Sequence, residues 1–153
     1  MGETRMSRPQ PLPRSACPFF YPLATRWADN DIFGHCNNVV YYSWFDTAVN
    51  RYYIEHGGFD PASATIVGYV VSSGCDYFAP VSHPAELELG LRVTRMGARS
   101  ISWEVAVYLS GDDSSRATGR FVHAFVDRRV DQSADIPAPI REAVSRLLVP
   151  PLD

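Results

Sequence analysis

Lysine is absent from this 153-residue chain, so all fourteen basic residues are arginine, and seventeen acidic residues outnumber them. The resulting formal net charge of −3 argues against nucleic acid as the main partner, because proteins that bind it usually present a basic face. A run of about 18 apolar residues is also missing, so no membrane span is predicted. The N-terminus has no apolar segment of the kind that a secretory signal requires.

Cysteine is scarce as well, with Cys17, Cys36 and Cys75 as the three examples. An odd number without short spacings predicts neither a disulfide framework nor a zinc site. Free thiols in a reducing cytosol are the simplest interpretation, so we expect a cytoplasmic protein. The histidines and acids show no ligand spacing either, and no metal is expected.

Proline, arginine and serine dominate residues 1–16, which we interpret as a disordered or loosely held N-terminal arm. Residues 17–153 have the length of a single domain. Strand-like residues occupy 19–28. The segment 38–56 contains no proline or glycine and is followed by two glycines, so it predicts a helix.

Apolar residues recur along the predicted helix at i, i+3, i+4 and i+7 spacing. The members of this stripe are Tyr41, Trp44, Phe45, Ala48, Val49, Tyr52 and Tyr53. Val39, Val40, Tyr42 and Ile54 extend the apolar surface further round. We therefore expect the helix to be buried on most sides.

Four consecutive segments, 65–80, 85–97, 100–110 and 116–130, each predict a strand, and a short helix is expected over 138–148. Consecutive strands favour antiparallel pairing, and the first strand can join them. The sequence thus predicts an α+β fold with an antiparallel five-stranded sheet wrapped round one long central helix. The open sheet edges and the remaining apolar helix surface favour a dimer.

The stretch DNDIFGHCNNVVYY, residues 29–42, places polar groups at the entrance of this helix. A helix N-terminus has unpaired N–H groups and about +0.5 elementary charge. Gly34 allows the loop to bend, so that Asp31 can fold back towards these amides. A carboxylate beside amides that bind an oxyanion can hydrolyse an activated acyl group. An acid before a helix can equally be a cap or a dipole partner, so spacing alone leaves both interpretations open.

The D-x-D pair followed by G-H-x-N-N and an aromatic-rich helix resembles the signature of the 4-hydroxybenzoyl-CoA thioesterase-like branch of the hotdog-fold acyl-CoA thioesterases. The resemblance covers about residues 19–130. It implies a hotdog fold that acts as a homodimer or homotetramer. It also implies hydrolysis of an acyl-CoA to free acid and CoA, for which no cofactor is needed because the CoA thioester is the substrate.

Four site residues follow from the resemblance. Asp31 matches the catalytic carboxylate, as general base or nucleophile, and the backbone N–H of Asn38 matches the oxyanion donor. His35 and Asn37 also occupy motif positions, with less defined roles. Some family members carry histidine or tyrosine where this chain has its two asparagines, and asparagine cannot act as a general acid.

The resemblance further implies that arginines at turns and strand ends hold the phosphates of CoA, because guanidinium pairs well with phosphate. The candidates are Arg95, Arg99, Arg128 and Arg129, each of which could instead be a solvated surface charge.

Several neighbouring residues are given structural roles. Asp29 is interpreted as positioning the turn by pairing with Arg26, and Cys36 as a buried apolar filler. Asp46 is interpreted as a buried hydrogen-bonded acid or the partner of an arginine, and His123 as a packed histidine.

Two other functions stay open. A hotdog enoyl-CoA hydratase would use an Asp and a His, for which Asp31 and His35 are close enough in sequence. A non-catalytic acyl-binding or assembly module would need neither. The sequence determines neither the acyl group nor whether Asp31 acts as base or nucleophile.

Overall fold

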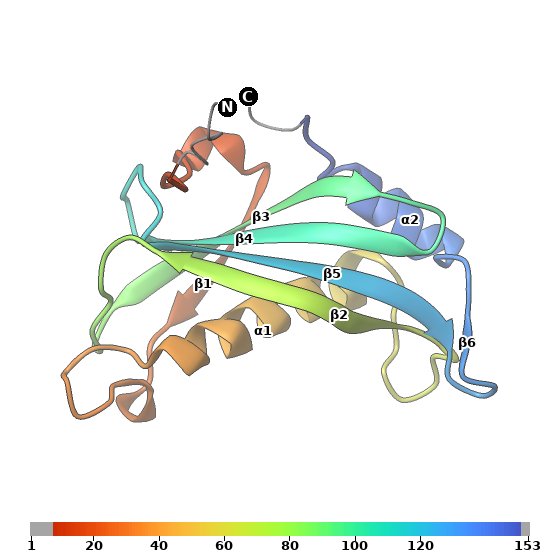
Figure 1. Cartoon of the computed structure of the whole chain (residues 1–153), viewed down its shortest axis with the longest axis horizontal. Coiled ribbons are helices and arrows are strands. Elements are labelled where there is room, and N and C mark those ends of the chain that lie inside the picture. The colour runs from red at the N-terminus through yellow and green to blue at the C-terminus, as the bar shows by residue number, and fades with distance from the viewer. Residues whose placement is uncertain (1–7, 151–153) are drawn as a thin grey trace, which may run out of the picture.

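The computed structural model describes residues 8–150, in which a curved antiparallel sheet wraps round one long helix, as predicted (Figure 1). The elements are η1 (Arg14–Ala16), β1 (Phe19–Ala24), η2 (Trp27–Asp29), α1 (Asn38–His56), β2 (Ile66–Tyr77), β3 (Glu86–Met96), β4 (Ser100–Leu109), β5 (Ala117–Asp127), β6 (Gln132–Ser133) and α2 (Ala138–Ser145). The predicted α+β class is confirmed. The two-residue β6, which pairs with β5, was not predicted, and α2 ends three residues earlier than expected.

The five long strands lie in the order β1-β3-β4-β5-β2, so β1 and β2 form the edges of the sheet. Alternate residues of each strand face α1, and those of the central strands are fully buried, such as Leu89, Leu91, Val105 and Val107. Within the described chain β2 pairs only with β5, which leaves its other edge open. An open edge is a ready template for pairing with another chain.

Helix α1 begins and ends where the sequence predicts. The Asn37 side chain accepts a hydrogen bond from the Val39 N–H at 2.9 Å, and Gly57 follows the last helical residue. All seven residues of the predicted stripe are buried. Close packing against the sheet depends on Gly119, because a Cβ there would lie 2.2 Å from the Phe45 ring.

The expectation that α1 is buried on most sides is wrong for this chain alone. Val39 is 69% exposed, Tyr42 39% and Ile54 48%. The sheet covers one face of the helix, and these residues lie outside the face it covers. An apolar helix surface that the chain itself does not bury is typical of a surface that another molecule covers.

Part of the predicted N-terminal arm falls within the described residues and packs on the sheet. Leu12 is buried, its N–H donates to Ser115 Oγ at 2.9 Å, and its carbonyl accepts from the Ser115 N–H at 3.1 Å. Arg14 pairs with Glu88 at 3.0 Å. Residues 1–7 of the arm lie outside the described residues, and the boundary at residue 16 stays a prediction. None of the helices in residues 8–150 is both long and apolar enough to cross a membrane.

Candidate active site

The loop between β1 and α1 starts with the predicted pair of Arg26 and Asp29. The Asp29 carboxylate is fully buried and accepts hydrogen bonds from the Arg26 backbone at 2.7 Å and from its guanidinium at 2.9 and 3.1 Å. The Asp29 carbonyl also accepts from the Asn37 N–H at 2.8 Å. These contacts hold the start of the loop, after β1, next to its end, before α1.

A second set of hydrogen bonds attaches the loop to the connection between β2 and β3. Asn30 Oδ1 accepts from the His83 N–H at 2.9 Å, and the Cys36 N–H donates to Val81 O at 2.7 Å. The bend lies at Gly34, whose φ of +82° is a conformation that favours glycine. The candidate site therefore rests on a loop that is held at several points, which suits precise positioning.

Asp31 folds back towards the start of α1, as predicted. Its side chain is half-buried, with Oδ1 accepting from the Phe33 N–H at 2.9 Å and Oδ2 lying 3.4 Å from Asn37 Nδ2. Because Asn37 also caps the helix, one side chain links the carboxylate to the helix entrance.

Only part of the expected set of free amides is available at that entrance. The Val39 N–H is occupied by the Asn37 side chain, and the Val40 N–H donates to the Asn37 carbonyl at 3.0 Å. Among residues 8–150 no acceptor contacts the N–H of Asn38, and the residue as a whole is exposed. This amide lies at the positive end of the helix dipole and can stabilise a developing oxyanion.

His35 lies in a cavity of about 330 Å³ beside the helix entrance. The cavity is lined by His35, Cys36, Asn38, Tyr41, Tyr77, Phe78, Ala79 and Pro80. Cys36 is 6% exposed, and burial raises the pKa of its thiol, so it stays protonated at neutral pH. It packs as the filler that the sequence predicts and is poorly suited to act as a nucleophile.

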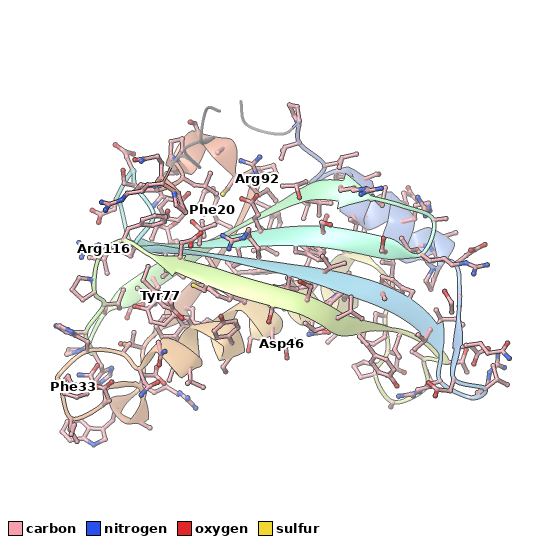
Figure 2. All side chains as sticks on the ribbon, in the orientation of Figure 1. Phe20, Phe33, Asp46, Tyr77, Arg92 and Arg116 are labelled. Carbon is pink, nitrogen blue, oxygen red and sulfur yellow. The ribbon has the colours of Figure 1, made fainter. Side chains whose placement is uncertain are left out.

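A second cavity, of about 540 Å³, lies between α1 and the open-edged strand β2. Its lining is mainly apolar and comprises Val39, Tyr42, Ser43, Phe45, Asp46, Thr47, Val70, Ser73 and Phe121. The interpretation of Asp46 as a buried acid or the partner of an arginine is wrong. Asp46 is exposed (Figure 2), and its carboxylate accepts a hydrogen bond from Asn50 at 3.1 Å. This groove is large and apolar enough to receive an organic chain.

The four candidate arginines lie near the end of β3, in the turn before β4, and directly after β5. Figure 1 shows these ends of the strands at the opposite end of the sheet from the loop that precedes α1. Arg128 contacts Pro61 and its N–H donates to Thr65, beyond the last turn of α1. Arg129 pairs with Asp127 and Arg99 with Asp135, and Arg95 is exposed near the end of β3. Since α1 has 19 residues and rises 1.5 Å per residue, roughly 28 Å separates its two ends. One chain therefore does not bring these arginines to Asp31.

Tyr77 is a residue that the sequence reasoning missed. It ends β2, and its hydroxyl donates to the Asn38 carbonyl at 3.0 Å (Figure 2). Alternation in β2 could have placed Cys75 and Tyr77 on the helix-facing side, but their position along α1 depends on a pairing register that sequence does not give. Among the described histidines, cysteines and acids, no three gather closely enough to hold a metal ion.

Comparison with known proteins identifies the family and agrees with the fold. The family model described as the Thioesterase superfamily matches residues 33–115, more than half of the chain. The PA5185 protein of Pseudomonas aeruginosa is 50% identical, with 90% of this chain and 96% of that chain covered and a TM-score of 0.89. PA2801 of the same organism, described as a proposed thioesterase, is 27% identical, with coverage of 88% and 99% and a TM-score of 0.76.

The uncharacterized protein YsmA of Bacillus subtilis is 27% identical over 84 residues, or 55% of this chain. That match spans only 56% of the length of the curated relative.

Proposed function

The chain belongs to the thioesterase superfamily, and from this premise we propose that it is an acyl-CoA thioesterase of the 4-hydroxybenzoyl-CoA thioesterase-like branch, acting in the cytoplasm. One observation carries the proposal. The Asp31 carboxylate contacts Asn37, and the next residue, Asn38, is exposed at the start of α1 with an N–H that contacts no acceptor within residues 8–150. Water is the only co-reactant that this chemistry needs.

In the reaction the thioester carbonyl oxygen accepts a hydrogen bond from the Asn38 N–H, which stabilises the negative charge of the tetrahedral intermediate. Asp31 either takes a proton from the attacking water or attacks the carbonyl itself to form a mixed anhydride that water then hydrolyses. In both routes the C–S bond breaks, CoA leaves as the thiolate, and the acyl group leaves as a carboxylate.

We assign the acyl group to the groove between α1 and β2. Val39 follows Asn38 directly and lines this groove, so a carbonyl held at the helix entrance has an apolar channel beside it. Phe45 and Phe121 are buried and line the groove. Burial of an apolar or aryl group in the groove stabilises the bound substrate by about 25 cal/mol for each Å² of apolar surface removed from water.

A second copy of the chain is expected to complete the site. The open edge of β2 carries Tyr69, Val70 and Val71, which are 49%, 50% and 62% exposed, next to the uncovered face of α1. If two chains pair antiparallel along β2, the start of one α1 lies beside the end of the other. The partner's Arg128 and the partner's Arg129 then lie on the side of the Asp31 loop, where the phosphates of CoA need cations.

Changing Val71 to lysine tests this assembly. A charge on an edge strand opposes pairing with another chain, so Val71→Lys is expected to convert the dimer to monomer and to lower specific activity about tenfold or more. Size-exclusion chromatography with light scattering and the hydrolysis rate measure the two effects. Val130→Lys is the matched control, because Val130 is 59% exposed but lies beyond β5. Unchanged mass and activity in Val71→Lys would remove β2 from the interface.

The proposed function itself is tested by thiol release. Purified protein is mixed with short-chain, long-chain and aryl acyl-CoAs, and free CoA is trapped with a chromogenic disulfide. We expect turnover with at least one acyl class. Hydration of crotonyl-CoA without thiol release would favour the hydratase. Ligand binding without turnover on any substrate would favour an acyl-binding module.

A further inference from the structure

The hydroxyl of Tyr77 lies at the entrance of α1, where it contacts Asn38, the residue whose N–H contacts no acceptor in the described part of the chain. Tyr77 Oη donates to Asn38 O at 3.0 Å, and the ring of Tyr77 meets that of Tyr41 edge-on, with centroids 5.1 Å apart. The Tyr77 side chain is 44% exposed and lines the cavity that also contains His35 and Asn38. The phenol is therefore both held in place and open to a ligand in that cavity.

Within residues 8–150, the backbone at the helix entrance offers a thioester oxygen one free N–H. Asn37 occupies the Val39 N–H, which leaves the N–H of Asn38. Oxyanion sites in acyl transfer commonly use two or more donors, and loss of one costs about 100- to 1,000-fold in kcat. Neither Asn37 nor Asn38 brings a hydroxyl or imidazole to the site.

We propose that Tyr77 is a catalytic residue whose hydroxyl supplies the second hydrogen bond to the thioester carbonyl oxygen, beside the Asn38 amide. This inference rests on the proposed thioesterase function. Rotation about the C–O bond of the phenol redirects its proton without moving the ring. The Asn38 carbonyl also lies within α1, where the helical hydrogen bond serves it when the phenol turns to substrate.

The proton of this phenol stays in place over the working range of pH. Burial, and then the neighbouring Cys75, raise the pKa of Tyr77 well above its usual value. The hydroxyl is thus a donor throughout and does not add negative charge next to the oxyanion. It stabilises charge without transferring a proton, so water, Asp31 and the CoA leaving group keep the roles described above.

Tyr77→Phe tests the inference, because phenylalanine keeps the ring that meets Tyr41 and loses only the hydroxyl. With an acyl-CoA that the unaltered protein hydrolyses, we expect kcat to fall by about 100-fold or more. The apparent KM should stay within about threefold, because the bond is strongest in the transition state. The pH profile should keep its shape at a lower plateau, since Tyr77 does not titrate in this range.

Tyr21→Phe is the matched control. It also removes one phenol hydroxyl and keeps the ring, but the Tyr21 hydroxyl donates to Glu55 at 2.8 Å near the far end of α1, so this variant is expected to hydrolyse at close to the normal rate. A kcat of Tyr77→Phe within about twofold of normal would overturn the inference and leave the thioesterase proposal standing. A displaced pH profile would also overturn the inference, as would a large fall in the thermal unfolding midpoint that accompanies the loss of activity. Either result would indicate that the Tyr77 hydroxyl stabilises the fold of the site rather than the oxyanion. Absence of thiol release by the unaltered protein on every substrate would instead overturn the thioesterase proposal and the role of Tyr77 with it.

Discussion

Replacing Asp31 with asparagine is expected to lower kcat for acyl-CoA hydrolysis at least about 100-fold, the usual scale for loss of a positioned base or nucleophile. Asparagine has nearly the same shape and keeps an oxygen for the Phe33 N–H, which donates to Asp31 at 2.9 Å. The loop should therefore fold as before, while the charge that attacks or activates water is gone. Initial rates of thiol release, with a thermal-unfolding curve for each protein, make the measurement.

Asp60→Asn is a matched control for this variant. Asp60 makes the same kind of local contact, accepting from the N–H two residues later at 3.0 Å, but lies beyond the far end of α1. Its loss is expected to leave hydrolysis within about twofold of normal. If Asp31→Asn hydrolysed acyl-CoA at a near-normal rate, Asp31 would have no place in the mechanism.

Local chemistry explains why the long helix and its entrance loop could be predicted from the sequence. Asn37 supplies an N-cap, Gly57 provides an end, and no proline or glycine interrupts residues 38–56, so the bounds of α1 agree with the prediction. The pairing of Arg26 with Asp29 spans only three residues. Such features depend on neighbours in the chain, which the sequence shows directly.

Features that depend on distant segments could not be predicted in the same way. The groove beside Val39 exists because β2 forms the open edge of the sheet, and that order reflects the packing of all five strands. Tyr77 reaches the helix entrance through its register with β5, in which it pairs with Ala117. Arg128 was assigned to the phosphates because it lies at the end of a strand. The sequence does not show that this strand end lies far from Asp31 within one chain.

A buried histidine in the core provides the basis for a second large effect, on stability rather than catalysis. His123 is 2% exposed, and its Nδ1 lies 2.8 Å from Tyr53 Oη, which in turn accepts from Trp103 Nε1 at 2.9 Å. Since the indole can only donate, the Tyr53 proton is free to point at the imidazole, which accepts it as the neutral form. Burial lowers the pKa of His123 to about 4 from the usual 6.5.

The unfolded chain therefore binds a proton at His123 at higher pH than the folded chain does. Stability from this residue is complete above about pH 6.5, falls as the pH drops below that value, and stops falling below about pH 4, where both states are protonated. A difference of this size corresponds to about 3 kcal/mol in the free energy of unfolding. His123→Gln removes the titration and keeps a polar group that can accept from Tyr53.

Urea unfolding of the unaltered protein and of His123→Gln, each at pH 7 and at pH 4.5, measures this effect. At pH 7 the unaltered protein should be the more stable of the two, because the imidazole fills its site in the core. Between pH 7 and pH 4.5 it should lose about 2 to 3 kcal/mol more than the variant does, since all other titrating groups are shared. An equal loss in both proteins would mean that His123 is protonated in the fold as easily as in the unfolded chain, and that its contact with Tyr53 does not depend on the neutral ring.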